Sequence, residues 1–134
     1  MIVAPPFLDS NILIYAYSTD RRSRAAQAIC ERRHTLSVQS LNEFANVARR
    51  KLGYEWANVA ERLATIVDLA DPIIELTFEM HQFGVALAER YKLQVYDSMI
   101  VAAAIEAGCE TLYSEDMHHG LVIEDRLTIL NPFV

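Results

Sequence analysis

The feature that most constrains the fold of this chain is an alternation of short apolar segments with longer helical ones. The segments with strand character are 6–8, 34–38, 73–77, 111–114 and 127–133. The segments with helical spacing of apolar residues lie between them, at about 10–17, 22–33, 39–53, 54–70, 78–92 and 96–108. Strands that alternate with helices predict an α/β domain with a mainly parallel sheet covered on both faces.

The segment 96–108, YDSMIVAAAIEAG, begins at an acid, is almost wholly apolar and ends at Gly108. A helix with so little polar surface has to be buried. The chain has 134 residues and is 52% hydrophobic, which is enough for one sizeable core. It has no repeat and no flexible linker, so we predict a single domain over residues 1–134.

The composition predicts a soluble, cytoplasmic protein with no membrane association. Pro5, Pro6 and Asp9 interrupt the N-terminal apolar run before it can serve as a signal peptide, and no apolar run is long enough to span a bilayer. The two cysteines, Cys30 and Cys109, have neither redox nor zinc spacing and are interpreted as reduced.

The net charge of −6 argues against binding of nucleic acid by bulk electrostatics. Ten of the twelve bases are arginine, however, and many of them cluster. A guanidinium suits phosphate, but such clusters are also typical of solvated helix faces and helix C-termini, and the sequence leaves both interpretations open. The clusters are residues 21–24, 32–33 and 49–51.

Four acids stand near the ends of the predicted elements. Asp9 follows the first strand in FLDSNILIY, Asp97 opens the buried helix, Asp116 closes the strand TLYS, and Glu43 lies in the helix after the second strand. Functional residues of parallel sheets gather beyond the carboxyl ends of the strands. Each acid also has a structural interpretation: helix caps for Asp9 and Asp97, a capping box of Ser40 with Glu43, and a turn residue for Asp116.

Several carboxylates gathered in one site repel one another and take up protons unless a hard divalent cation compensates them. Oxygen ligands favour Mg²⁺ or Mn²⁺, and the corresponding reaction is metal-assisted hydrolysis of a phosphoester. The spacing of the four acids does not by itself establish that they converge.

Four sequence blocks, in this order, resemble the acidic blocks of the PIN-domain family, and within it the VapC-type ribonuclease toxins of toxin–antitoxin modules. They are FLDSNILIYAY, SVQSLNEFANVARRK, YDSMIVAAAIEAG and TLYSEDM. The resemblance implies that Asp9, Glu43, Asp97 and Asp116 are the catalytic residues that hold one or two Mg²⁺ or Mn²⁺ ions. It also implies supporting roles for two polar residues, Asn11 and Ser114.

The same resemblance implies a three-layer α/β/α sandwich with a four- or five-stranded sheet, and endonucleolytic cleavage of RNA that leaves a 5′-phosphate and a 3′-hydroxyl. It further implies a homodimer or higher oligomer and inhibition by a cognate antitoxin protein. Glu115 competes with Asp116 for the fourth position. The pair His118-His119 falls outside the family pattern and is interpreted as loop.

A groove for an amphipathic antitoxin helix is one interpretation of the helices at 22–33 and 54–70, whose apolar residues stand next to charge. Core packing is the other interpretation, and for Trp56 the favoured one. The apolar residues in question are Tyr54, Trp56, Val59 and Leu63.

Two other protein classes require residues that this chain lacks. A receiver-type signalling domain requires a late lysine, and no lysine follows Lys92; a D-x-D phosphatase requires an acid where Asn11 stands. A stand-alone PIN-domain nuclease and a non-catalytic protein that binds RNA or a peptide with the same fold remain open.

Overall fold

A computed structural model describes residues 3–134, and its centre is one six-stranded sheet in the order β3-β2-β1-β4-β6-β5. All neighbours are parallel except β5, which runs antiparallel to β6. The strands are β1 Phe7–Leu8, β2 His34–Ser37, β3 Ala70–Ile74, β4 Thr111–Tyr113, β5 Val122–Ile123 and β6 Leu127–Leu130. The predicted sandwich with a mainly parallel sheet is confirmed, with one or two strands more than expected.

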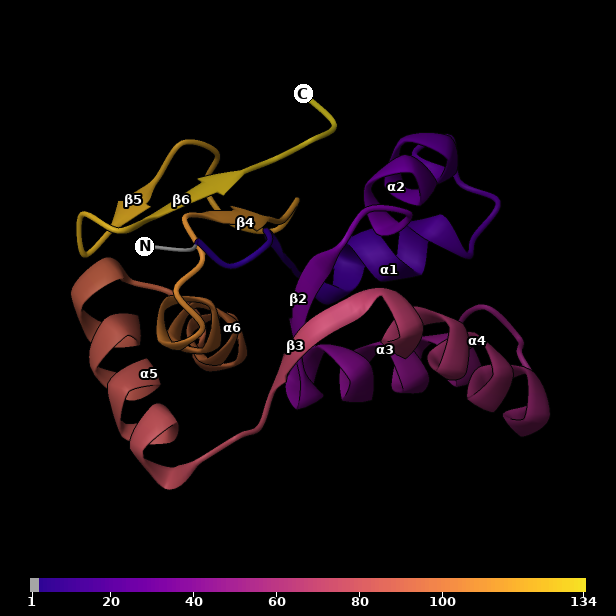
Figure 1. Cartoon of the computed structure of the whole chain (residues 1–134), viewed down its shortest axis with the longest axis horizontal. Helices are drawn as coiled ribbons and strands as arrows, with labels where there is room; N and C mark the ends of the chain where they lie inside the picture. The colour runs from indigo at the N-terminus through magenta and orange to yellow at the C-terminus, as the bar shows by residue number, and fades with distance from the viewer. Residues whose placement is uncertain (1–2) are drawn as a thin grey trace.

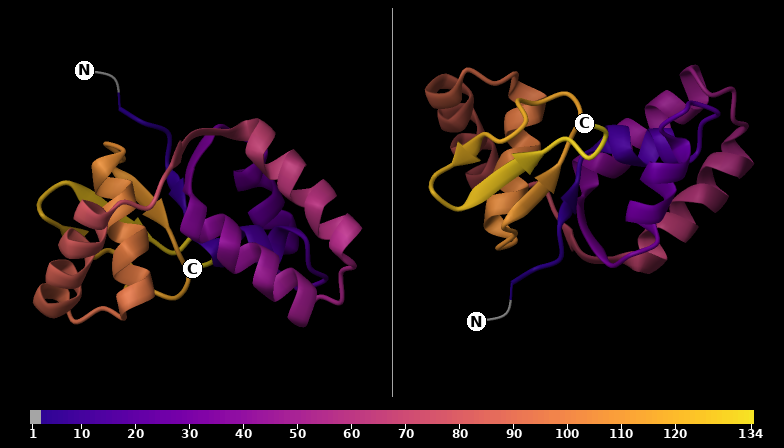
Figure 2. Two further views of the ribbon diagram at one scale, coloured as in Figure 1. Left: turned by 90° about the horizontal axis from the view of Figure 1, so that it is seen from below. Right: turned by 90° about the horizontal axis from the view of Figure 1, so that it is seen from above.

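Within residues 3–134, six helices cover the sheet. They are α1 Ser10–Ala16, α2 Ser23–Cys30, α3 Val38–Arg50, α4 Trp56–Leu69, α5 Phe78–Tyr91 and α6 Val95–Glu106. Figure 1 shows α5 and α6 beside β4 to β6, while α1 to α4 lie at the other end of the molecule. The two turned views in Figure 2 show the same division, with the chain of β1 passing between the two groups.

Strand β1 separates two hydrophobic clusters. Successive side chains of a strand point to opposite faces of the sheet, so Phe7 packs with α5 and α6 while Leu8 packs with α1 to α4. Both side chains are fully buried. The residue after them, Asp9, is therefore carried out of the sheet at the junction of the two clusters.

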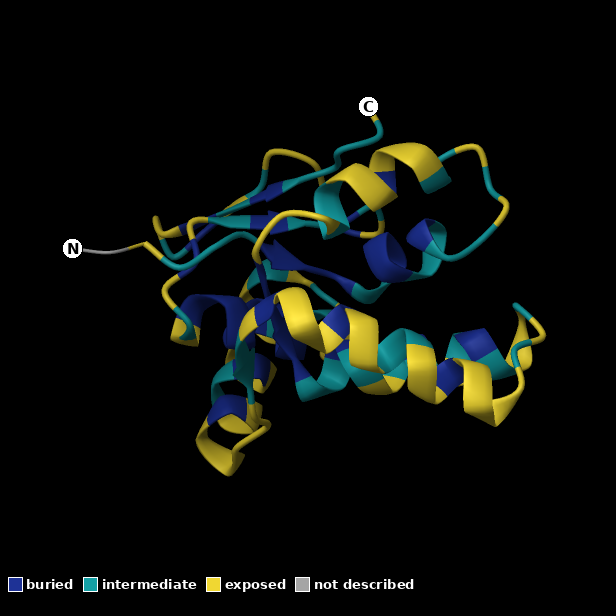
Figure 3. Ribbon diagram, turned by 45° about the vertical axis from the view of Figure 1, so that its right-hand side comes forward, coloured by how far each residue is buried: buried dark blue, intermediate teal, exposed yellow. Residues whose placement is uncertain are grey.

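Helix α6 is buried along most of its length, as its apolar sequence predicts. Residues 98–105 are all buried, and Figure 3 shows the interior elements in dark blue against outer helices with exposed stripes. Gly84 of α5 allows a close approach, because a Cβ atom there would lie 2.7 Å from the sulfur of Met99. No helix within residues 3–134 has both the length and the apolar content needed to cross a membrane.

The structure corrects three details of the predicted elements. Strand β3 begins at Ala70, earlier than the predicted strand at 73–77, and includes Pro72. Because β3 is an edge strand, the missing N–H of a proline is tolerated there. Helix α3 is capped by Ser37, whose Oγ accepts a hydrogen bond from the backbone N–H of Ser40, so the capping box of Ser40 with Glu43 is wrong. Strand β5 was not predicted.

Candidate active site

Asp9 directly follows the first strand and caps the first helix. Its Oδ1 accepts a hydrogen bond from the backbone N–H of Ser10 at 2.7 Å. Its Oδ2 accepts from the hydroxyl of Ser114 at 2.8 Å and from the side-chain amide of Asn11 at 3.3 Å. With only 3% of its surface exposed, the Asp9 carboxylate is held in one orientation by three donors.

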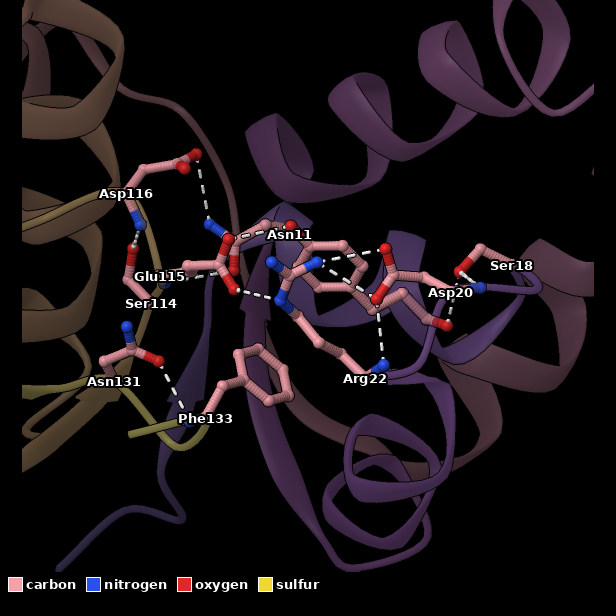
Figure 4. A network of polar contacts seen from close by, with 10 residues as sticks. Asn11, Ser18, Asp20, Arg22, Ser114, Glu115, Asp116, Asn131 and Phe133 are labelled. Carbon is pink, nitrogen blue, oxygen red and sulfur yellow. Dashed lines mark hydrogen bonds and ion pairs between the residues drawn. The ribbon is translucent and has the colours of Figure 1, made fainter.

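Asn11 and Ser114 connect Asp9 to Asp116. The side-chain amide of Asn11 donates to Asp116 Oδ2 at 3.2 Å as well as to Asp9, and the Ser114 hydroxyl accepts from the backbone N–H of Asp116 at 3.2 Å. Figure 4 shows Asn11 between Asp116 and Glu115, with Ser114 below Asp116. The two predicted supporting residues therefore lie where they orient the acids that follow β1 and β4.

The other two predicted acids approach from helices. Glu43 lies in the middle of α3, and its Oε2 accepts a hydrogen bond from the side chain of Gln39, one turn earlier, at 3.0 Å. Asp97 lies in the first turn of α6, whose cap position is Gln94, so the capping interpretation of Asp97 is wrong. Both acids are half-buried.

All four predicted acids line one hollow of about 290 Å³. The structure thus brings together residues that the sequence separates by up to 107 positions, the distance from Asp9 to Asp116. The hollow is completed by Ser10, Asn11, Ile14, Asn46 and Val47, and no lysine, arginine or histidine is among its lining residues.

No basic side chain lines the hollow to balance the negative charges of its acids. Burial, followed by the charges of Asp97 and Glu43, raises the pKa of Asp9 to about 7, against the lowering effect of its hydrogen bonds. Burial and the charges of Asp116 and Glu43 also raise the pKa of Asp97. Without a cation, these acids hold protons that they would not hold in water.

The donor set fits a hard divalent cation. Carboxylate oxygens and the amide oxygens of Asn side chains are the ligands that Mg²⁺ and Mn²⁺ prefer, and a cation would relieve the repulsion that raises the pKa values. Within residues 3–134, no three acids, histidines or cysteines lie close enough together to hold one metal ion among them. An open arrangement is compatible with Mg²⁺, which is usually held by one or two carboxylates and keeps several waters.

Glu115, the neighbour of Asp116, is held away from the hollow. Its Oε1 accepts from the hydroxyl of Tyr15 at 2.8 Å, and its Oε2 lies 2.9 Å from Nε of Arg22. Arg22 also lies over the ring of Tyr15, 4.8 Å from its centroid, and pairs with Asp20. In Figure 4 the guanidinium of Arg22 is seen between Glu115 and Asp20. Of the two adjacent acids, only Asp116 lines the hollow.

Several other candidate groups have structural roles. His118 and His119 are exposed in the loop before β5, as predicted, and Nδ1 of His119 accepts from the backbone N–H of Asn131. Members of each arginine cluster make internal contacts, which supports the structural interpretation for them. These contacts join Arg22 to Asp20 and Glu115, Arg33 to Asp71, and Arg49 to the backbone oxygen of Tyr54.

Sequence reasoning missed two residues at the site. Asn46 lines the acidic hollow, and Tyr96 lies beside it in a second hollow that also contains Glu43. The position of Asn46, one turn after Glu43 on the same helix, was a signal that could have identified it. Tyr96 directly precedes Asp97 and offered no comparable signal.

Comparison with known proteins gives a family and a fold. A model of the PIN domain matches residues 7–120. None of the curated proteins searched matches the chain significantly. A chain of a toxin–antitoxin complex from Klebsiella pneumoniae has a TM-score of 0.70 and 22% identity, over 95% of this chain and 97% of that one.

Two further solved structures share the fold. VapC20 of Mycobacterium tuberculosis, described as a toxin that cleaves the sarcin–ricin loop, has a TM-score of 0.67 and 16% identity, over 82% of this chain and 90% of its own. VapBC2 of Rickettsia felis, solved with a DNA fragment from its promoter, has a TM-score of 0.59 and 18% identity, over 92% of this chain and 95% of the other. The TM-scores show that these proteins share the fold of this chain, and at identities this low the likeness extends to the fold alone.

Proposed function

This chain belongs to the PIN-domain family, and on that premise we propose that it is a metal-dependent endoribonuclease and the toxin of a toxin–antitoxin module. The observation that carries the proposal is the convergence of Asp9, Glu43, Asp97 and Asp116 on one hollow whose lining contains no basic side chain. Acids that repel one another, three of them buried or half-buried, beside amide groups, suit a site that is completed by a divalent cation.

In this proposal the four acids are the catalytic residues and hold one or two Mg²⁺ ions, for which Mn²⁺ substitutes. When bound, the ion supplies the charge that activates a water molecule and stabilises the phosphate in the transition state. The chain itself fixes the geometry. Asn11 and Ser114 hold the carboxylates of Asp9 and Asp116 in register, and the hydrogen bond from Gln39 holds that of Glu43.

The raised pKa values of the acids make the binding of a cation depend on pH. At neutral pH, part of the Asp9 population carries a proton, which must leave when a cation binds. Burial, with the charges of Asp116 and Glu43, also raises the pKa of Asp97, so its proton is held more tightly than in water. Cation affinity therefore rises with pH through the neutral range.

Cleavage by the purified protein tests the proposal. We expect single-stranded RNA to be cut internally with Mg²⁺ or Mn²⁺ present, and cutting to stop when EDTA removes the ion and to return when excess Mn²⁺ is added. A gel of an end-labelled RNA measures this. Cutting that is unchanged in EDTA would contradict the metal-dependent mechanism, and the absence of cutting with every ion would favour the non-catalytic alternative.

An antitoxin partner is proposed from the surface near α2 and α4. Trp56 is 65% exposed at the start of α4, so its favoured core-packing interpretation is wrong; Val59 is buried, while Tyr54 and Leu63 are half-buried and pack against the core. A mainly apolar hollow of about 280 Å³ lies between α1, α2 and α4, with Leu13, Ile66 and Leu69 in its lining. A hollow framed by helices suits the apolar side chains of an amphipathic helix.

Two observations distinguish a toxin from a stand-alone nuclease: which gene lies beside that of the protein, and whether the product of that gene inhibits cleavage of RNA. A toxin is encoded beside a small protein that blocks its cleavage of RNA, whereas a stand-alone nuclease has no such neighbour. Assembly as a homodimer or higher oligomer stays a prediction.

A further inference from the structure

We propose that the hollow around Tyr96 binds one nucleobase of the RNA by stacking, an inference that rests on the proposed ribonuclease function. The hollow has a volume of about 330 Å³ and is lined by Gln39, Asn42, Glu43, Asn46 and Tyr96. Glu43 and Asn46 also line the acidic hollow, so the two hollows adjoin. A nucleotide whose phosphate lies at the acids can place a neighbouring base over Tyr96.

Tyr96 offers a free aromatic face next to the site. Its side chain is 68% exposed, although it directly precedes the half-buried Asp97 in the first turn of α6. Among residues 3–134, its ring has no aromatic or cationic partner and its hydroxyl makes no hydrogen bond to the protein. An aromatic ring in this position is available to stack with an unpaired base.

The rest of the lining selects an uncharged ligand. Gln39, Asn42 and Asn46 contribute amides, which both donate and accept hydrogen bonds, as the edges of nucleobases do. With Glu43, they stand at positions 39, 42, 43 and 46 of α3, where each is three or four positions from two of the others, and so they share one face of that helix. No lysine or arginine lines this hollow, and Glu43 is acidic, so a phosphate is disfavoured there while a neutral heteroaromatic ring is accommodated.

The test measures stacking directly. A short RNA that contains the fluorescent base 2-aminopurine is titrated with the whole chain in Ca²⁺, and a gel verifies that the RNA stays uncut. We expect wild type and Tyr96→Phe to quench the fluorescence, because both keep an aromatic face. We expect Tyr96→Ala to lose the quenching and to bind about 5- to 160-fold more weakly, the range for removal of one base–aromatic stack.

Phe78→Ala is the matched control. Phe78 is also 68% exposed, but it stands at the start of α5, stacks on His81 and lines neither hollow. We expect this variant to bind and quench as wild type does. In cleavage assays, Tyr96→Ala should raise KM more than it lowers kcat, because the lost contact serves binding.

Three outcomes would overturn the inference. Equal quenching and affinity in wild type and Tyr96→Ala, with RNA cleavage intact, would remove the base subsite and leave the ribonuclease function standing. A shift of Tyr96→Ala to a smaller oligomer, measured by light scattering together with the loss of binding, would assign Tyr96 to a subunit contact. A wild-type chain that neither binds nor cuts RNA would overturn the proposed function and the subsite with it.

Discussion

Replacing Asp9 with asparagine is expected to lower RNA cleavage by more than about a hundredfold while the chain stays folded. Mutation of residues that hydrogen-bond to metal ligands typically lowers metal affinity or activity 10- to 100-fold. Asp9 is proposed as a ligand itself, so we expect a larger loss of activity. Asp9 contributes two oxygens and a negative charge at the centre of the site, and asparagine keeps only one oxygen and no charge.

The fold should tolerate this change because asparagine keeps the shape of the side chain. Its remaining oxygen can still accept the N–H of Ser10 and preserve the cap of α1, and the hydroxyl of Ser114 can turn to accept from the new amide. Circular dichroism and thermal unfolding check the fold, and initial rates on a labelled RNA check the activity.

Asp68→Asn is the matched control for charge. Asp68 is an exposed acid on α4, makes no ion pair among the described residues and lines neither the acidic hollow nor its neighbour. It removes the same single charge, so its rate should equal that of wild type. Full activity in Asp9→Asn, beside an unchanged control, would exclude the proposed metal site.

The metal-free chain is expected to lose stability as the pH rises from about 4 to 8. In the unfolded chain Asp9 releases its proton near its ordinary pKa of 3.8, whereas in the folded chain burial raises the pKa to about 7. Between these values the folded state binds one more proton, so the free energy of unfolding falls as the pH rises. At about 1.4 kcal/mol per pKa unit, the loss amounts to as much as about 4 kcal/mol.

Added Mg²⁺ should reverse this loss, because a cation binds the ionised acids of the folded state. The stabilisation by Mg²⁺ should therefore be largest above pH 7 and small near pH 4. Asp9→Asn should reduce the pH dependence of the metal-free chain, since one of the two acids with a raised pKa is gone and Asp97 remains. Urea unfolding at several pH values, with EDTA or with millimolar Mg²⁺, measures both effects; a stability of the metal-free chain that rises from pH 5 to 8 would contradict this account of the site.

Sequence patterns were a sufficient guide to the main elements because most helices bury one face, while the elements without polar residues are buried on all sides. Helix α6 was recognised from its lack of polar residues, and β1 from its apolar run before Asp9. Strand β5 escaped because it has two residues, Val122 and Ile123, and is held by pairing to β6, a tertiary contact. The predicted strand at 73–77 starts too late because it begins after Pro72, whereas the position of β3 at the edge of the sheet makes this proline compatible with a strand.

The acids of the site were identified from the order of four sequence blocks, and their convergence came from the resemblance. Capping and chemistry did not compete at Asp9, where one oxygen caps α1 and the other meets Asn11 and Ser114. What the sequence did not predict was the surroundings of the acids. Glu115 points away from the hollow because it contacts Arg22 and Tyr15. The second hollow forms where α3 and α6 meet. Tertiary packing determines both features.

The most direct test of the central claim is the chemistry of the ends that the protein leaves on RNA. RNA fragments are made with Mn²⁺ by wild type and by Asp9→Asn. One portion of each is sequenced after ligation of an adapter that requires a 5′-phosphate, and another after the 5′-phosphate has been removed. Hydrolysis by a water activated at the acidic site predicts internal cuts with 5′-phosphate and 3′-hydroxyl ends in wild type and none above background in the variant. Fragments with cyclic-phosphate ends, or equal cutting by the variant, would contradict it.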